Sequence, residues 1–193
     1  ISDLEGLIGV QSLESSYELL EVRLSANTFR SGSIPLGILA DLSADIRRMF
    51  GFAALRFGEG GAAKKRVPEA IYQQLDIRLA GLLPGSSRLI VAAAANRDLF
   101  DSGPAQQTLT RVFDIVQSAG AGERFLESVS DLGPSSARNL RDMLRVVRAQ
   151  SASLHLEWSH RGNTVASWTG EKPQVDRLTA ALERTELKEQ REQ

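Results

Sequence analysis

The chain has 193 residues, of which 42% are hydrophobic and 24% are charged, a composition typical of one globular domain with a core of its own. Its 23 basic and 24 acidic side chains leave a net charge of −1, so bulk charge gives no attraction to nucleic acid or to an anionic membrane. The chain has no cysteine, which excludes disulfides, thiolate zinc sites and cysteine nucleophiles. No apolar run approaches the roughly 18 residues of a membrane-spanning helix, so we expect no membrane partner.

Arginine greatly outnumbers lysine, and alanine is abundant. This bias is typical of GC-rich bacterial genomes, so we expect a bacterial protein. The absence of cysteine leaves the compartment open, and we take the cytoplasm as the default. The first residue is Ile1 and the last residues are almost wholly charged, so we expect a piece of a longer chain, which leaves a removed signal peptide open. We divide the chain into a single α+β domain over residues 1–185 and a charged helical extension over residues 186–193, the start of a linker or of a truncated region.

Hydrophobic and polar residues alternate over residues 16–26, which predicts a strand with one apolar and one polar face. Apolar residues at helical spacing follow Pro35 and continue to about Arg56, which predicts a long helix. Residues 57–66 (FGEGGAAKKR) are rich in glycine and predict a loop. After Pro68 we expect a turn or a short helix.

Residues 75–95 (LDIRLAGLLPGSSRLIVAAAA) alternate, break at Pro84-Gly85 and resume, which predicts a hairpin. The register that keeps the apolar residues on one face places Leu79 opposite Leu89 and leaves residues 82–86 as the connection. Leu82 and Leu83 would then lie at the hairpin tip, where polar residues are usual. We expect these two leucines either to fold back onto the helices of the domain or to contact a partner.

Four further helices are predicted beyond this hairpin, from the spacing of their apolar residues. The first begins at Pro104 after a cap at Asp101-Ser102, a shorter one follows Gly122, another begins at Pro134, and the last begins at Pro173. Between the last two, SLHLEWSH and TVASWT alternate around a short turn and predict a second hairpin. The fold class that follows is α+β, with a mainly antiparallel sheet of about five strands packed against several helices.

The second hairpin carries both tryptophans. A two-residue turn places Trp158 on the apolar face and Trp168 on the opposite face with His155 and Glu157, where an exposed tryptophan beside polar groups is a candidate partner contact. The alternatives are that helices cover both faces of the sheet, or that a three-residue turn reverses the register. The HxE pair on one strand face is a weak metal signal, and we expect no metal and no cofactor.

Arginines recur at helical spacing in the helix that follows Pro134. They fall within an arc of about 80° beside the apolar face; they are Arg138, Arg141, Arg145 and Arg148. Together with the loop residues Lys64, Lys65 and Arg66 they are candidates for contact with phosphate or nucleic acid. The alternative is a solvated helix flank whose arginines pair with neighbouring acids.

Phosphate-loop and hydrolase signatures are absent from the sequence. The loop at 57–66 has no Ser or Thr after its lysines, and no G-x-S-x-G occurs. LPGSS precedes a strand rather than a helix, so it predicts a turn. Carboxylate pairs could share a proton or bind metal, although acids near helix starts are ordinary; the pairs are Asp98 with Asp101, Asp41 with Asp45, and Glu123 with Glu127.

Three classes of function follow. We first expect a non-catalytic protein–protein interaction or assembly module that acts through the hairpin-tip leucines and an exposed sheet or helix face, with a protein partner or self-association. The alternative is a nucleic-acid- or nucleotide-binding domain that uses the arginines and the KKR loop. The third is an enzyme that uses Asp, His and Glu chemistry at Asp98, Asp101, His155 and Glu157.

Overall fold

The computed structural model describes residues 16–27, 29, 33–58, 66–83, 87–97, 102–118 and 120–191, and within them all side chains except those of residues 82, 83 and 187–191. Its helices and strands follow one another along the chain in the order that the sequence predicts. In chain order they are β1 (Tyr17–Ser25), α2 (Leu36–Gly58), α3 (Glu69–Leu75), β2 (Arg78–Leu83), β3 (Ser87–Ala94), α4 (Pro104–Gln117), α5 (Gly122–Leu132), α6 (Pro134–Ala149), β4 (Ser153–His160), β5 (Asn163–Gly170) and α7 (Lys172–Arg191).

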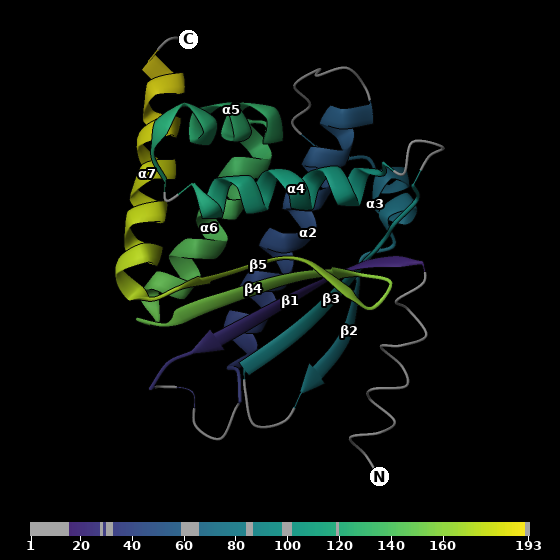
Figure 1. Cartoon of the computed structure of the whole chain (residues 1–193), viewed down its shortest axis with the longest axis horizontal. Coiled ribbons are helices and arrows are strands. Elements are labelled where there is room, and N and C mark those ends of the chain that lie inside the picture. Colours follow the sequence, from purple (N-terminus) through teal and green to yellow (C-terminus); the bar gives the residue numbers. More distant parts are fainter. Residues whose placement is uncertain are drawn as a thin grey trace.

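The five strands form one antiparallel sheet in the order β2-β3-β1-β4-β5. The two hairpins therefore flank the N-terminal strand, which lies in the middle of the sheet (Figure 1). This arrangement confirms the α+β class and the antiparallel pairing. The outer strands β2 and β5 each have one strand neighbour.

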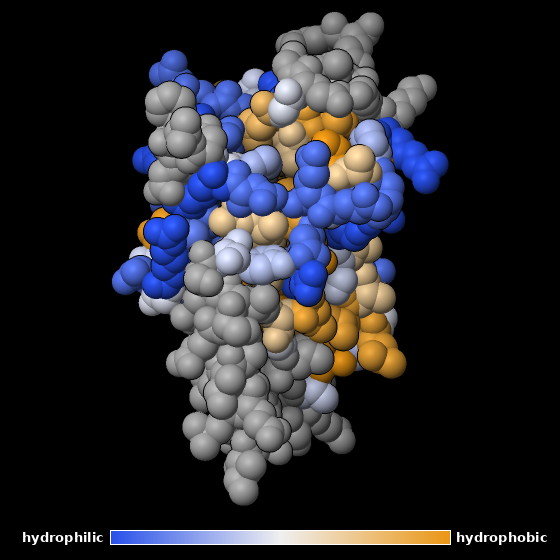
Figure 2. Space-filling model, turned by 90° about the vertical axis from the view of Figure 1, so that its right-hand side faces the viewer, coloured by the Kyte–Doolittle hydropathy of each residue, from blue (hydrophilic) through white to orange (hydrophobic). Residues whose placement is uncertain are grey.

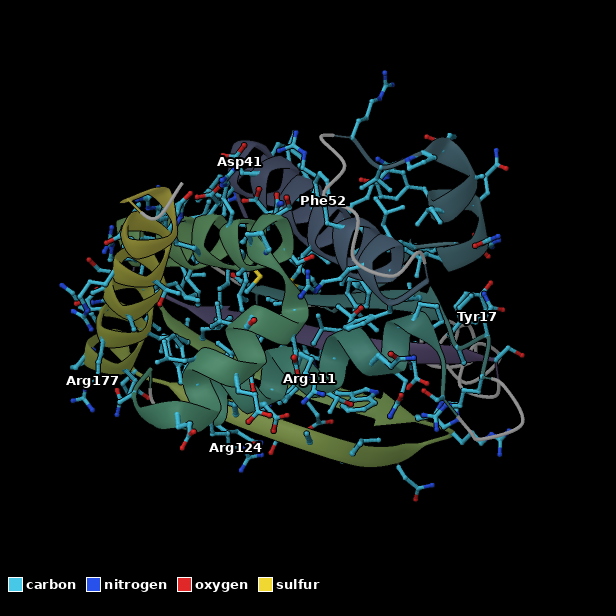
Figure 3. All side chains as sticks on the ribbon, turned by 90° about the horizontal axis from the view of Figure 1, so that it is seen from above. Tyr17, Asp41, Phe52, Arg111, Arg124 and Arg177 are labelled. Carbon is cyan, nitrogen blue, oxygen red and sulfur yellow. The ribbon has the colours of Figure 1, made fainter. Side chains whose placement is uncertain are left out.

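The main core lies between the sheet and the helices. It joins buried side chains of all six described helices to alternate residues of the strands, such as Leu20 and Val22 of β1 and Leu156 of β4. Figure 3 looks down on this helical layer over the sheet. A second, small cluster contains strand residues only, with Leu19 and Ile90 among them. The helices that the structure describes therefore pack on one face of the sheet.

Local sequence explains where several elements begin. Gly133 has a φ of +88°, which glycine adopts at little cost, and Pro134 follows it as the first residue of α6. The turn between β4 and β5 consists of Arg161 and Gly162, both with positive φ, which matches the twist of a two-residue hairpin. The predicted cap of α4 is wrong, because the N-cap is Gly103 and no side chain caps it.

The first hairpin differs in register from the prediction. Leu79 lies opposite Val91 rather than Leu89. The pairing starts nearer the turn than predicted, with Leu83 opposite Arg88, and a bulge between Leu79 and Gly81 then shifts it by one residue. β2 starts later than predicted, since Leu75 is the last residue of α3, and it continues to Leu83. The prediction that Leu82 and Leu83 belong to the connecting loop is therefore wrong; their backbones pair with β3. Residues 84–86 lie outside the described residues.

None of the described helices combines the length and the apolar character that crossing a bilayer requires.

Candidate interaction surface on the sheet

The register of the sheet lines up polar side chains on the face opposite the helices. Arg88, Arg23 and His155 lie opposite one another on β3, β1 and β4. Two residues away along β1, Glu21 lies opposite Glu157 of β4. We call these five residues the charged sheet face. The prediction that the first strand has one apolar and one polar face is confirmed by this register, with Glu21 and Arg23 on the polar face.

Glu21 is the centre of the charged sheet face. Its carboxylate accepts hydrogen bonds from Arg23 Nη2 at 2.8 Å and from Arg88 Nη2 at 2.5 Å, and its side chain is 11% exposed. Burial by itself would raise the pKa of Glu21, but the hydrogen bond and charge of Arg88, and then those of Arg23, lower it. Glu21 is therefore held as a carboxylate that two guanidinium groups share.

Arg88 has a donor that Glu21 does not use. Its Nε is buried and, in the part of the chain that the structure describes, has no hydrogen-bond partner. A buried donor without an acceptor costs about 1–3 kcal/mol.

His155 and Glu157 lie on the same face, as predicted. Nδ1 of His155 hydrogen-bonds with Thr169 Oγ1 at 2.8 Å, and its Nε2 lies 3.9 Å from a carboxylate oxygen of Glu157. Within the described residues, no third histidine or carboxylate joins them in a group that could hold a metal ion. The pair can donate and accept hydrogen bonds at the surface.

Trp168 lies on the other face of the sheet, so the prediction that it joins His155 and Glu157 is wrong. The turn has two residues, as predicted, but a bulge places Trp158 opposite Ala166 and Ser159 opposite Thr164. One extra residue in β5 reverses the alternation beyond it. Trp168 then lies opposite Leu156 and packs against the main core.

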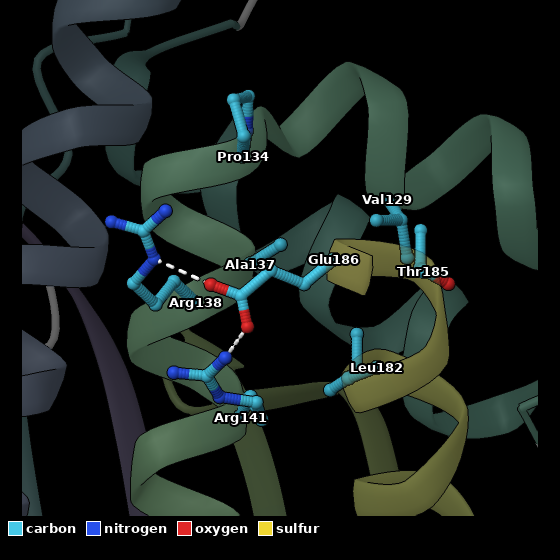
Figure 4. A pocket seen from close by; sticks show the side chains of 8 residues that line it. All are labelled: Val129, Pro134, Ala137, Arg138, Arg141, Leu182, Thr185 and Glu186. Atoms are coloured by element: carbon cyan, nitrogen blue, oxygen red, sulfur yellow. Dashed lines mark hydrogen bonds and ion pairs between the residues drawn. The ribbon is translucent and has the colours of Figure 1, made fainter. Parts of the chain in front are cut away.

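The four arginines of α6 form one row, as their spacing predicts. They are Arg138, Arg141, Arg145 and Arg148. Glu186 of α7 pairs with two of them: its carboxylate accepts from Arg138 Nε at 2.9 Å and from Arg141 Nη1 (Figure 4). The Arg141 side chain is only 9% exposed and also pairs with Asp142 at 2.7 Å.

Glu183, one turn earlier on α7, pairs with the other two. Arg145 Nε lies 2.8 Å and Arg148 Nη2 lies 3.2 Å from the same carboxylate oxygen. The hydrogen bond from Arg145 lowers the pKa of Glu183, and the charge of Arg148 adds to this effect. The arginine row therefore joins α6 to α7 through carboxylates, which is the alternative that the sequence left open.

Several predicted site residues lie elsewhere. Lys64, Lys65, Asp98 and Asp101 fall outside the described residues, and Arg66 is exposed before α3. Glu123 and Glu127 are both exposed on α5. None of the described members of this set joins the charged sheet face.

Asp41 and Asp45 lie one turn apart on α2, as predicted. Asp41 is exposed and Asp45 is buried. Burial, and then the negative charge of Asp142, raise the pKa of Asp45, while Arg48 at 3.9 Å opposes this effect. Burial therefore disfavours the ionised form of Asp45, and we assign no binding or catalytic role to the two carboxylates.

One polar cluster was missed by the sequence reasoning. Glu18 is fully buried and accepts hydrogen bonds from Trp158 Nε1 and from Arg97 Nε, both at 2.8 Å. His160 Nδ1 lies 3.4 Å from the same carboxylate. The signal was present in β1, because extending its alternation back from Leu20 places Glu18 on the inner face.

A shallow hollow of about 200 Å³ lies between α5 and α7. Its lining is mainly small or apolar and comprises Gly120, Ala121, Gly122, Phe125, Leu126, Ala181, Arg184 and Thr185. Leu126 is 52% exposed there.

Large apolar side chains are also exposed on both edge strands, Leu79 on β2 and Val165 on β5. Figure 2 shows apolar residues exposed at the height of the sheet, beside a band of hydrophilic ones. Comparison of the chain with known protein families, characterised proteins and solved structures finds no match.

Proposed function

We propose that this chain is a non-catalytic protein–protein interaction or assembly module, and that the charged sheet face contacts a protein partner. The observation that supports it most is the arrangement around Glu21: two guanidinium groups and one carboxylate are held in register on a sheet face that the described helices leave free. A rigid sheet holds such groups in place, so little ordering cost remains for binding.

The charges of this cluster indicate the chemistry of the partner. Around Glu21, Arg23 and Arg88 carry two positive charges and Glu21 supplies one negative charge. Glu157 adds a second carboxylate elsewhere on the charged sheet face, so the excess of positive charge is local to this cluster. The side chains of Arg23 and Arg88 are 43% and 31% exposed, so the uncompensated charge is within reach of a partner. An acidic side chain of a partner protein would complete this balance by accepting from the exposed parts of the Arg23 and Arg88 guanidinium groups.

The test removes the positive charge of Arg23 and Arg88 and compares partner binding with that of a variant that loses two arginines elsewhere on the surface. The double variant Arg23→Gln with Arg88→Gln and the matched control Arg161→Gln with Arg177→Gln, both exposed in the wild type, are used as baits in lysate of the source cells. We expect a stoichiometric partner with the wild type and the control. We expect the sheet-face variant to bind it about 30-fold or more weakly, which corresponds to about 2 kcal/mol. Equal capture by all three baits, or no partner with any bait, contradicts the proposal.

The nucleic-acid alternative has weaker support. Three residues of the arginine row keep part of their surface, with Arg138 52%, Arg145 46% and Arg148 37% exposed. Each is already paired with a carboxylate, and a phosphate would have to displace it. Binding to single- or double-stranded nucleic acid that falls steeply with salt, and is lost in Arg145→Glu, would favour this alternative.

A further inference from the structure

The two edges of the sheet differ in how they are protected. β2 has six residues, a bulge and Arg78, which pairs with Asp76 at 2.7 Å. Short length, bulges and charge are the features that keep an edge strand from pairing with another chain. β5 has eight residues and contains neither a charged residue nor proline.

The second half of β5 is a regular strand. Ala166 to Gly170 pair with β4 without interruption, because the bulge lies before Ala166. The carbonyl of Ser167 accepts a hydrogen bond from Gln117 Nε2, which places the backbone groups of Ser167 on the side away from β4. Backbone direction alternates along an antiparallel strand, so Thr169 also presents its N–H and C=O at this outer edge.

The described structure offers little cover for this edge. The bond from Gln117 is 3.4 Å long and comes from an exposed side chain, so it is easily replaced. Ser167 and Thr169 are exposed. An unpaired, regular and uncharged edge is a template for another strand.

We infer that β5 pairs antiparallel with β5 of a second copy of this chain. The lack of charge from Asn163 to Gly170 selects this occupant, since a charged strand would place like charges opposite one another across a twofold axis. The net charge of −1 adds little repulsion between copies. The pairing joins two five-stranded sheets into one.

The regular part of β5 also indicates the register. With Trp168 at the twofold axis, Ser167 lies opposite Thr169 of the second copy, and only the uninterrupted residues Ala166 to Gly170 are used. The two indoles then lie side by side on the helix face, and a cross-strand aromatic pair is favourable. Trp168 is partly buried, and its indole ring lies over Gly170. A Cβ atom on residue 170 would lie only 2.1 Å from Cη2 of Trp168. On the opposite face, the two charged sheet faces become one continuous surface.

The first experiment is light scattering coupled to size-exclusion chromatography over a range of protein concentrations. We expect the wild type to reach twice the chain mass of 21.0 kDa. Ser167→Lys with Thr169→Lys places lysines opposite lysines and should halve the measured mass. The control Asn163→Lys with Thr164→Lys adds the same charge to the same strand outside the paired segment and should remain dimeric.

The second experiment tests the register and holds even where the lysine variant does not fold. The wild type has no cysteine, so Ser167→Cys and Thr169→Cys each introduce a single thiol. Residues opposite one another in such a pair are about 5.5 Å apart at Cα, within disulfide range. Mixing the two variants under oxidation should give a linked heterodimer, whereas Ser167→Cys with Asn163→Cys should not.

A wild type that stays monomeric at every concentration overturns the inference, and so does a dimer that the lysines leave intact. Absence of the heterodimer overturns the register. The sheet-face variant Arg23→Gln with Arg88→Gln should dimerise like the wild type, so failure of the partner proposal and failure of this one give different results.

Discussion

Glu18 offers the sharpest test of the packing between the sheet and the loop that follows β3. Its carboxylate is fully buried and is satisfied by Arg97 and by the indole N–H of Trp158. Glu18→Gln keeps the shape of the side chain but removes its charge. The Arg97 side chain, which is 16% exposed, then loses its ion pair with Glu18. Breaking a buried pair in this way costs about 3–5 kcal/mol, a large share of the 5–15 kcal/mol that is typical of a domain.

Trp158→Phe removes the other donor and keeps an aromatic ring beside Phe113, whose centroid lies 6.2 Å away. Loss of a hydrogen bond to a charged group costs about 1.5–3 kcal/mol. Glu18→Gln keeps an oxygen that can accept from the indole but removes the charge that strengthens the bond, and Trp158→Phe removes the bond itself. Both changes act on the same charge-assisted bond, so the double variant should be less destabilised than the sum by about 1–2 kcal/mol.

Urea unfolding followed by circular dichroism measures all three variants, with Glu157→Gln as the control. Glu157 is a carboxylate on the same strand as Trp158, and its side chain is 37% exposed, so its substitution should change stability by less than about 0.5 kcal/mol. The reasoning is refuted if Glu18→Gln falls within about 1 kcal/mol of this control, or if the two substitutions are additive.

Three further substitutions test single features. Burial raises the pKa of Asp45 above the usual value of 3.8. The ionised form is therefore less stable in the folded protein, and the free energy of unfolding falls as pH rises from 3.8 through the raised pKa. Above that pH, Asp45→Asn should be more stable than the wild type in urea titrations. The hydrogen bond from Arg145 lowers the pKa of Glu183, so that carboxylate stabilises the fold above pH 4.5 and the benefit is lost as pH falls through the lowered value. Glu183→Gln should therefore be less stable by up to about 1 kcal/mol at neutral pH, with the difference closing in acid. Gly170→Ala should cost about 1–3 kcal/mol, seen as a lower thermal midpoint and a changed Trp168 emission, because the new methyl meets the indole.

The elements of the fold were predictable because each has a local cause. Alternation defines β1, and Gly133 with Pro134 marks the start of α6. The pairing partners were not predictable to the residue. In β5 a single bulged residue moves Trp168 from the face of His155 to the face of Leu156, and nothing in the local sequence of a polar strand marks such a bulge.

The first hairpin shows the same limit. The apolar residues of 75–95 fit more than one register, and the prediction took the one that placed most of them on one face. The structure instead ends α3 at Leu75 and inserts a bulge after Leu79. The packing of Leu75 in the main core thus decides where β2 begins. The alternation of apolar and polar residues in the sequence does not indicate which of them pack in that core.

The arginine row shows why spacing alone does not assign a surface. The period of α6 correctly groups four arginines, but their role depends on α7, where Glu183 and Glu186 lie three residues apart and so meet the row at two successive turns. With Asp142 these acids supply three negative charges for four positive ones. Around Glu21 the ratio is one negative charge for two. Glu157, the second carboxylate of the charged sheet face, evens the count over that face as a whole, so the unmet positive charge is local to Arg23, Glu21 and Arg88. This local excess, on a face that no described helix covers, is the physical reason to look for an acidic partner there rather than on the more conspicuous helix.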